Sequence, residues 1–131
     1  MSIVAALIRD AKGRVLLVRK AGTRAFMQPG GKREAGEDDL AALDRELSEE
    51  LGCSVVAGSA IPLGEFRAPA ANETDRDVAA ALYAVAIEGT AQPLAEIAEI
   101  LWFDPHRPPD VDLAPLTRDH ILPLSRVQAG R

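Results

Sequence analysis

The chain has 131 residues, of which 47% are hydrophobic and 27% charged, and its formal net charge is −5. This composition is typical of a soluble globular protein, and the length is enough for one hydrophobic core, so we expect a single domain over residues 1–131. The negative charge argues against a nucleic-acid partner, and the longest apolar run is too short to span a membrane. The single cysteine allows no internal disulfide and fits a reducing, cytoplasmic compartment.

The N-terminal part of the chain predicts short strands and turns. Residues 3–8 form an apolar strand, residues 10–13 (Asp-Ala-Lys-Gly) form a turn, and residues 14–19 alternate as the return strand of a hairpin. Residues 26–28 then lead into a tight turn at residues 29–31, which read Pro-Gly-Gly.

An amphipathic helix is predicted over residues 38–51. Asp38 is a good N-cap, and Gly52 stands where a helix ends in the left-handed conformation. Four leucines spaced by three, four and four residues form one apolar stripe: Leu40, Leu43, Leu47 and Leu51.

The remainder of the chain predicts four strands and a second helix. The strands are expected at residues 54–57, 63–67, 78–87 and 100–103, with loops at 68–76 and 90–98. The run 78–87 is long and apolar, as expected for a buried central strand. Residues 113–127 predict a helix that Pro123 should kink or end. Helices mixed with strands in this way indicate an α/β or α+β layer fold.

Three glutamates on the predicted helix, Glu46, Glu49 and Glu50, fall within about one third of its circumference. Like charges at these spacings destabilise a helix, and Arg45 cannot neutralise all three. Clustered carboxylate oxygens beside an open space suit Mg²⁺ or Mn²⁺. The alternative is a solvated acidic face, and the helix alone leaves both interpretations open.

Residues 31–53 resemble the Nudix box. The family pattern is Gly, five residues, Glu, seven residues, then Arg-Glu-aliphatic-any-Glu-Glu-any-Gly-aliphatic. Eight of its nine defined positions match: Gly31, Glu37, Arg45, Glu46, Leu47, Glu49, Glu50 and Gly52. The departure is Cys53, where the family has Ile, Leu or Val, and we expect the small apolar cysteine to keep the packing role. The resemblance implies the Nudix α/β/α sandwich with a mixed sheet, in which the box forms a loop-helix-loop.

The resemblance also implies an activity, the Mg²⁺-dependent hydrolysis of a nucleoside diphosphate linked to another moiety, with Mn²⁺ as an alternative ion. The compact size is similar to that of MutT-like members, so a (d)NTP pyrophosphohydrolase is expected first. An ADP-sugar or dinucleoside polyphosphate hydrolase is an alternative, because Pro69 lies sixteen residues past Cys53, as in ADP-ribose-type members. A non-catalytic, nucleotide-binding regulatory module is the alternative from another class, although the intact acid set argues against it. The expected partner is a small nucleotide, with no nucleic acid and no membrane, and the protein is expected to be a monomer or a homodimer.

Carried over position by position, the resemblance makes Glu46, Glu49 and Glu50 metal ligands, with the backbone carbonyl of Gly30 or Gly31 as a further ligand. Glu46 is alternatively the residue that activates water. Arg45 and Glu37 are expected to orient the acids, and a purely structural ion pair is the other interpretation.

Outside the box, the resemblance points to one more acid that faces the metal. Glu96 is the first candidate and Glu99 the second, and the alternative for each is a solvated loop acid. Lys32, Arg19 and Arg24 are candidate phosphate contacts, against the simpler interpretation that they are ordinary surface cations.

Overall fold

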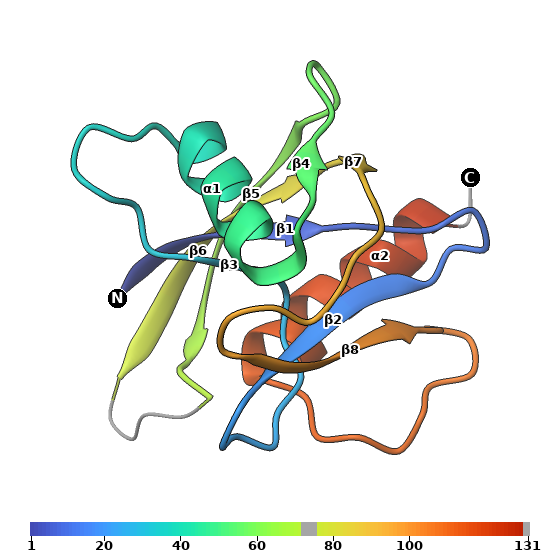
Figure 1. Cartoon of the computed structure of the whole chain (residues 1–131). Helices are drawn as coiled ribbons and strands as arrows, with labels where there is room; N and C mark the ends of the chain where they lie inside the picture. The colour runs from blue at the N-terminus through green and yellow to red at the C-terminus, as the bar shows by residue number, and fades with distance from the viewer. Residues whose placement is uncertain (72–75, 130–131) are drawn as a thin grey trace.

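The computed structural model describes residues 1–71 and 76–129, with side chains described up to residue 125 (Figure 1). Its elements are β1 (Ser2–Leu7), β2 (Val15–Lys20), β3 (Gly30–Gly31), α1 (Asp39–Leu51), β4 (Ser54–Val55), β5 (Ile61–Pro69), β6 (Asp77–Ala84), β7 (Ile87–Glu88), β8 (Ile97–Phe103), the π-helix η1 (Thr117–Ile121) and α2 (Leu122–Ala129).

The strands form a four-stranded sheet in the order β3-β1-β6-β5, a β2-β8 pair and a short β4-β7 pair. β1 runs parallel to β6, whereas β3 and β5 are antiparallel to their neighbours, so the predicted mixed sheet is confirmed. The predicted central strand 78–87 is confirmed as β6, which lies between β1 and β5 but ends at Ala84.

The predicted hairpin of residues 3–8 and 14–19 is wrong in its pairing. The turn itself forms, since Gly13 N donates to Asp10 O at 3.0 Å. Beyond a single bridge between Arg9 and Val15, however, β2 leaves β1 and pairs along its length with β8. The reason is that β1 already has a neighbour on each edge, β3 and β6, so no edge remains for β2.

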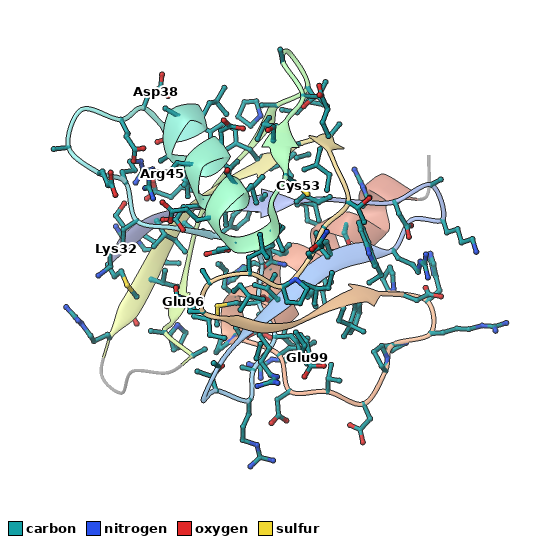
Figure 2. All side chains as sticks on the ribbon, viewed as in Figure 1. Lys32, Asp38, Arg45, Cys53, Glu96 and Glu99 are labelled. Carbon is teal, nitrogen blue, oxygen red and sulfur yellow. The ribbon has the colours of Figure 1, made fainter. Side chains whose placement is uncertain are left out.

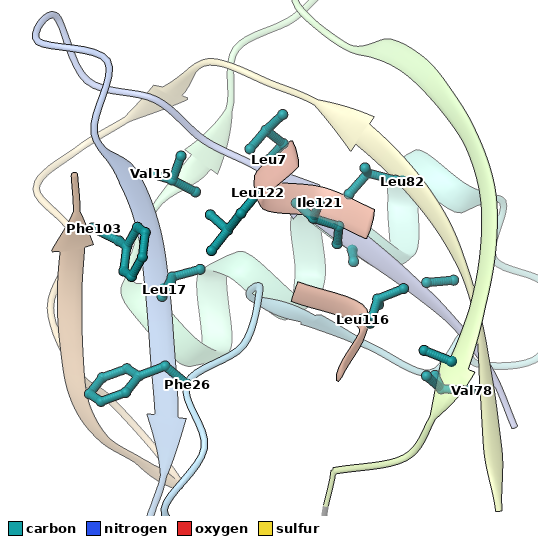
Figure 3. Packing of buried hydrophobic residues seen from close by; sticks show 13 residues of the cluster. Leu7, Val15, Leu17, Phe26, Val78, Leu82, Phe103, Leu116, Ile121 and Leu122 are labelled. Atoms are coloured by element: carbon teal, nitrogen blue, oxygen red, sulfur yellow. The ribbon is translucent and has the colours of Figure 1, made fainter. Parts of the chain in front are cut away.

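Side chains that alternate along β1 and β2 divide the core into two layers, because successive residues of a strand point to opposite faces. One layer packs against α1 and includes Val4, Ala6, Leu16, Val18, Leu43, Leu47 and Leu51. The other packs against η1 and α2 and includes Leu7, Val15, Leu17, Leu116, Ile121 and Leu122 (Figure 3). Helices therefore cover both faces of the strands, which confirms the predicted α/β/α sandwich (Figure 1).

The caps of α1 are those predicted. The Asp38 carboxylate accepts a hydrogen bond from Ala41 N at 2.8 Å, and Gly52 adopts the left-handed conformation with φ 70°. The leucine stripe is correct except at its start, because Leu40 is 44% exposed. Leu40 lies in the first turn, before Ala42, which is the first residue of α1 to enter the core layer.

Other boundaries differ from those predicted. β8 begins at Ile97, earlier than the expected strand at 100–103, and residues 72–75 of the expected loop 68–76 lie outside the described residues. Pro123 does not end the C-terminal helix. Instead, the π-helix η1 precedes it, and Leu122 N donates to Thr117 O. The wider π turn accommodates a proline ring that would otherwise meet the carbonyl four residues earlier.

Candidate metal and nucleotide site

The glycine turn and α1 bring two of the three predicted ligand carboxylates together. Glu50 is only 4% exposed, and its Oε1 accepts a hydrogen bond from Gly30 N at 3.3 Å. The Glu46 carboxylate lies directly against Gly31 and is close enough to Glu50 to raise the pKa of Glu50. A Cβ at position 31 would meet the Glu46 carboxylate, so a larger residue there would force that carboxylate to move.

The environment of Glu50 disfavours its charged form. Burial, followed by the nearby Glu46 carboxylate, raises the pKa of Glu50 to about 8, although the Gly30 amide and Lys20 act in the opposite direction. The Glu50 carboxylate is buried and the Glu46 carboxylate beside it is half-buried, so their negative charges repel. A divalent cation bound between them would offset that charge. Glu46 and Glu50 therefore fit an Mg²⁺ or Mn²⁺ ion by the chemistry of their oxygens.

Glu49, the third predicted ligand, points elsewhere. Its side chain is 56% exposed, and its Oε1 lies 3.5 Å from Arg45 Nη1. In the part of the chain that the structure describes, no group of three or more His, Cys, Asp or Glu side chains is arranged to hold a metal ion. The donor set seen in the structure is thus a pair of carboxylates beside a glycine turn.

Arg45 links the box loop to the carboxylate pair. Its Nε and Nη2 donate to the two oxygens of Glu37 at 2.8 and 2.9 Å, a bidentate contact. Its Nη1 donates to Glu46 Oε1 at 2.9 Å, and its Nη2 also donates to the Lys32 carbonyl at 3.0 Å. The guanidinium, followed by the Glu34 backbone amide, lowers the pKa of Glu37 to about 2. Glu37 therefore holds Arg45, and Arg45 in turn holds Glu46.

A cavity of about 410 Å³ opens beside the carboxylate pair. Its lining includes Glu46, Glu50 and the glycine turn on the α1 side, and Leu116 and Thr117 on the η1 side. Between them the walls are mostly apolar, with Ile3, Met27 and Val78 among the lining residues. A site with carboxylates that fit a divalent cation at one end and apolar walls beyond it has the form expected for a small organic phosphate.

The remaining candidates separate into two groups. Lys32 and Glu96 line this cavity, and Glu96 lies 3.7 Å from Lys20 Nζ. Glu99 does not line it, since Glu99 accepts a hydrogen bond from Arg19 Nε at 2.7 Å beside a separate surface hollow. Figure 2 shows Glu96 on the same side of the molecule as Lys32 and Arg45, with Glu99 below the β8 ribbon.

Arg19 and Arg24, the other candidate phosphate contacts, belong to that second hollow together with Glu99. Arg24 lies 3.5 Å from Asp112. Both arginines therefore face carboxylates outside the cavity that contains Glu46 and Glu50.

Sequence reasoning missed three polar lining residues, Lys20, Gln28 and Thr117. Lys20 stands at the end of β2, beside a register shift in the β2-β8 pair that no sequence pattern indicates. Gln28 and Thr117 share a hydrogen bond across 89 residues, so only the tertiary fold brings them together. Cys53 is 1% exposed in the α1 core layer, which confirms its packing role.

The NUDIX domain model matches residues 1–124 of the chain. The chain therefore belongs to the Nudix family, the family of hydrolases that the box indicates. The fold comparisons agree. The solution structure of the E. coli ORF135 protein is similar, with TM-score 0.71 and 28% identity over 98% of this chain and 88% of that one. The MutT NUDIX hydrolase from Burkholderia pseudomallei gives TM-score 0.75 at 22% identity, over 97% of this chain and 95% of that one, which shows the shared fold.

Among curated proteins, the chain is 47% identical over 49 residues to an RNA pyrophosphohydrolase of Halorhodospira halophila (strain DSM 244 / SL1). It is 39% identical over 56 residues to an 8-oxo-dGTP diphosphatase of Haemophilus influenzae (strain ATCC 51907 / DSM 11121 / KW20 / Rd). The first match covers 37% of this chain and 27% of the relative, and the second covers 40% and 41%. The chain thus matches less than half the length of either relative.

Proposed function

We propose that this chain is a Mg²⁺-dependent pyrophosphohydrolase of MutT-like type, which cleaves a nucleoside triphosphate between two of its phosphates. The observation that carries the proposal is the meeting of Glu46 and Glu50 at the glycine turn, on the wall of a cavity large enough for a nucleotide. The names of the two curated relatives, a pyrophosphohydrolase and a diphosphatase, support the same reaction class.

In this proposal Glu46 and Glu50 hold the ion from the α1 side. A bound Mg²⁺ would supply neutralisation of the pyrophosphate charge and orientation of the attacking water. Arg45 keeps Glu46 in one orientation through the hydrogen bond at 2.9 Å, and the bidentate contact with Glu37 keeps Arg45 in place. The exposed Glu49, which directly precedes Glu50 on α1, is available to a further ion that arrives with the substrate.

The cations on the cavity wall attract the substrate. Lys20 and Lys32 both line the cavity, so their ammonium groups place positive charge beside the space in which the phosphates would lie. Glu96 lies on the same wall, where it is the candidate to accept a proton from water. The apolar walls exclude water from the nucleoside part of the substrate.

The test is incubation of the purified protein with Mg²⁺ and a panel of nucleoside triphosphates, nucleoside diphosphate sugars and dinucleoside polyphosphates, with products separated by chromatography. We expect Mg²⁺-dependent release of pyrophosphate and a nucleoside monophosphate from a triphosphate, and no turnover in EDTA. Cleavage restricted to the sugar or dinucleotide substrates would replace the MutT-like assignment. Tight nucleotide binding with no product from any substrate would favour the regulatory module.

We further propose a cytoplasmic location, in keeping with a single, buried and unpaired cysteine. Within the described residues, no helix has both the length and the apolar character needed to cross a bilayer.

A further inference from the structure

The connection between β7 and β8 is attached to the C-terminal end of α1 (Figure 1). Leu94 N donates to the backbone carbonyl of Glu50 at 2.9 Å, and Gln92 N donates to that of Leu51 at 3.1 Å. The last carbonyls of an α-helix have no partner within the helix, so this connection supplies the donors that two of them need. Glu50 therefore holds the β7–β8 connection through its backbone, while its carboxylate belongs to the cavity.

A tight turn follows at once and carries Glu96. Ile97 N donates to Leu94 O at 2.9 Å, which closes the turn around Ala95 and Glu96. The Glu96 carbonyl accepts a hydrogen bond from Ala21 N at 2.8 Å, directly after the end of β2. The backbone around Glu96 is thus held from the α1 side and from the β2 side, and its side chain lines the cavity together with the carboxylate pair.

Ala95 has a backbone conformation that alanine rarely adopts. Its φ is 52°, and in the part of the chain that the structure describes it is the one residue other than glycine with a positive φ. A tight turn with a positive φ favours glycine or asparagine, because the Cβ of other residues crowds the backbone. The Ala95 side chain is exposed and outside the cavity lining, so the hydrogen bonds on either side impose this conformation. Strain that the surroundings impose in this way is concentrated at functional sites.

We infer that Ala95 is a positioning residue for Glu96, because its positive φ turns the chain so that the Glu96 side chain lies on the cavity wall. The inference rests on the proposed function, in which Glu96 accepts a proton from the attacking water. A proton acceptor must lie within hydrogen-bond reach of a water that the ion at the carboxylate pair orients. The hydrogen bond from Leu94 to the Glu50 carbonyl anchors the turn to α1. The turn therefore sets the spacing between the ion and the acceptor.

Three substitutions of Ala95 separate its backbone conformation from its side chain. Ala95→Val should lower kcat by about tenfold, because a β-branched residue adopts a positive φ only with strain and Glu96 would be misplaced. Ala95→Gly and Ala95→Asn should keep kcat close to wild type, since both residues accept this φ. KM should change little in all three, because Ala95 does not line the cavity. Wild-type kcat in Ala95→Val, or an equal loss in all three variants, would overturn the inference.

A double-mutant cycle with Glu96→Gln shows whether Ala95 acts through Glu96. Glu96→Gln alone should lower kcat by about a hundredfold, a usual contribution of a general base. In that background, Ala95→Val should lower kcat by less than about twofold more, because no proton acceptor remains to be positioned. Losses that multiply would show a structural role of Ala95 that is independent of Glu96, and would overturn the inference.

Binding of Mn²⁺ and a second turn alanine provide the controls. The Kd for Mn²⁺, measured by calorimetry, should be the same in Ala95→Val as in wild type, because the substitution leaves the carboxylate pair intact. A weakened Kd would show that the turn acts on α1 instead of on Glu96, and would overturn the inference. Ala11→Val, at an exposed position in the turn of residues 10–13 and outside the cavity lining, should leave kcat and Kd unchanged.

The wild-type protein and Glu96→Gln distinguish failure of this inference from failure of the proposed function. If the wild-type protein with Mg²⁺ turns over no substrate of the nucleotide panel, the proposed function is wrong and the inference is overturned with it. If the wild-type protein hydrolyses a triphosphate and Glu96→Gln keeps near-normal kcat, the proposed function stands. The inference alone is then overturned, because Glu96 is not the proton acceptor.

Discussion

Gly31 and Glu46 meet so closely that a Cβ at position 31 would lie 2.6 Å from Glu46 Cδ and 2.8 Å from each carboxylate oxygen. The neighbouring Gly30 is restricted differently, because its Cβ would lie 2.1 Å from the backbone oxygen of Val4, and its φ is 147°. One glycine therefore leaves room for a functional side chain, and the other leaves room for the β1 backbone.

Gly31→Ala should lower Mg²⁺-dependent turnover by about tenfold or more while the protein stays folded, since the group displaced is the movable end of Glu46. Gly30→Ala should instead destabilise the protein by about 2–4 kcal/mol, because a backbone contact and a positive φ are both violated. Turnover and thermal melting of the two variants separate these effects. Equal losses of stability in both would show that Glu46 is not held by the glycine turn as described.

Glu50→Gln is the most direct test of the carboxylate pair. If Glu50 holds the ion, turnover should fall by at least about a hundredfold, equivalent to roughly 2.7 kcal/mol of transition-state stabilisation. The metal-free protein should be no less stable, because a buried repulsive pair is relieved. Near-normal turnover of a folded Glu50→Gln protein would show that Glu50 does not hold a catalytic metal ion.

The matched control for Glu50→Gln is Glu88→Gln, an exposed acid of β7 that does not line the cavity. Asp39, on α1 but outside the acid cluster, is a less suitable control than its sequence position suggests. Its carboxylate pairs with Arg33 and accepts a hydrogen bond from Tyr83 OH, so its removal would disturb the start of the helix. Glu88→Gln should retain wild-type turnover and melting.

The stability of the metal-free protein should depend on the titration of Glu50. Because the pKa of Glu50 is raised from 4.5 to about 8 in the folded state, the folded protein holds a proton that the unfolded chain releases between these values. This contribution to the free energy of unfolding is fully present below pH 4.5 and is lost as the pH rises through about 8. Urea melts in EDTA between pH 5 and 9 measure it. The decline should be smaller in Glu50→Gln, and an unchanged slope in that variant would contradict the shift.

Mg²⁺ or Mn²⁺ should reverse that decline, because the ion favours the charged carboxylates. Binding to the folded state alone stabilises it by about 2.7 kcal/mol at a metal concentration a hundredfold above Kd. The increase in Tm over EDTA should therefore be larger at pH 8 than at pH 6. If millimolar metal raised the Tm at neither pH 6 nor pH 8, with or without a nucleotide product, the result would count against a metal site at Glu46 and Glu50.

Arg45→Lys should weaken both metal binding and turnover by about 10–100-fold, the usual effect of losing a partner that orients a ligand. Lysine keeps the charge but cannot make the fork-shaped contact with Glu37 and also reach Glu46 and the Lys32 carbonyl. The readout is the Kd for Mn²⁺ by calorimetry, followed by kcat with saturating metal. A variant with lowered Tm but unchanged Kd and kcat would show that Arg45 forms only a structural ion pair.

The features predicted from the sequence were those whose signals are local. The caps Asp38 and Gly52 lie at the ends of one helix, and the spacing of the box placed Glu46 and Glu50 one turn apart on the same side. Periodicity did not distinguish Glu49 from Glu50, because both lie within the same third of the helix. Packing against the glycine turn buries one and leaves the other exposed.

The features that were missed depend on long-range contacts. Arg19 and Glu99, separated by 80 residues, are partners in the β2-β8 pair, so neither is available to the cavity as the sequence had suggested. The Gln28 amide is buried by a helix that follows it by 89 residues. No local pattern records either contact.

The pairing of β2 with β8 has a consequence for the chain while it is being synthesised, because the two strands are far apart in the sequence. At roughly 5–20 residues per second, a ribosome needs several seconds or more to synthesise the chain between Arg19 and Glu99. During that time β2, four of whose six residues are destined for burial, has no ladder partner and presents an apolar edge. The nascent chain is therefore most exposed to aggregation after α1 has emerged but before β8 is available to pair with β2.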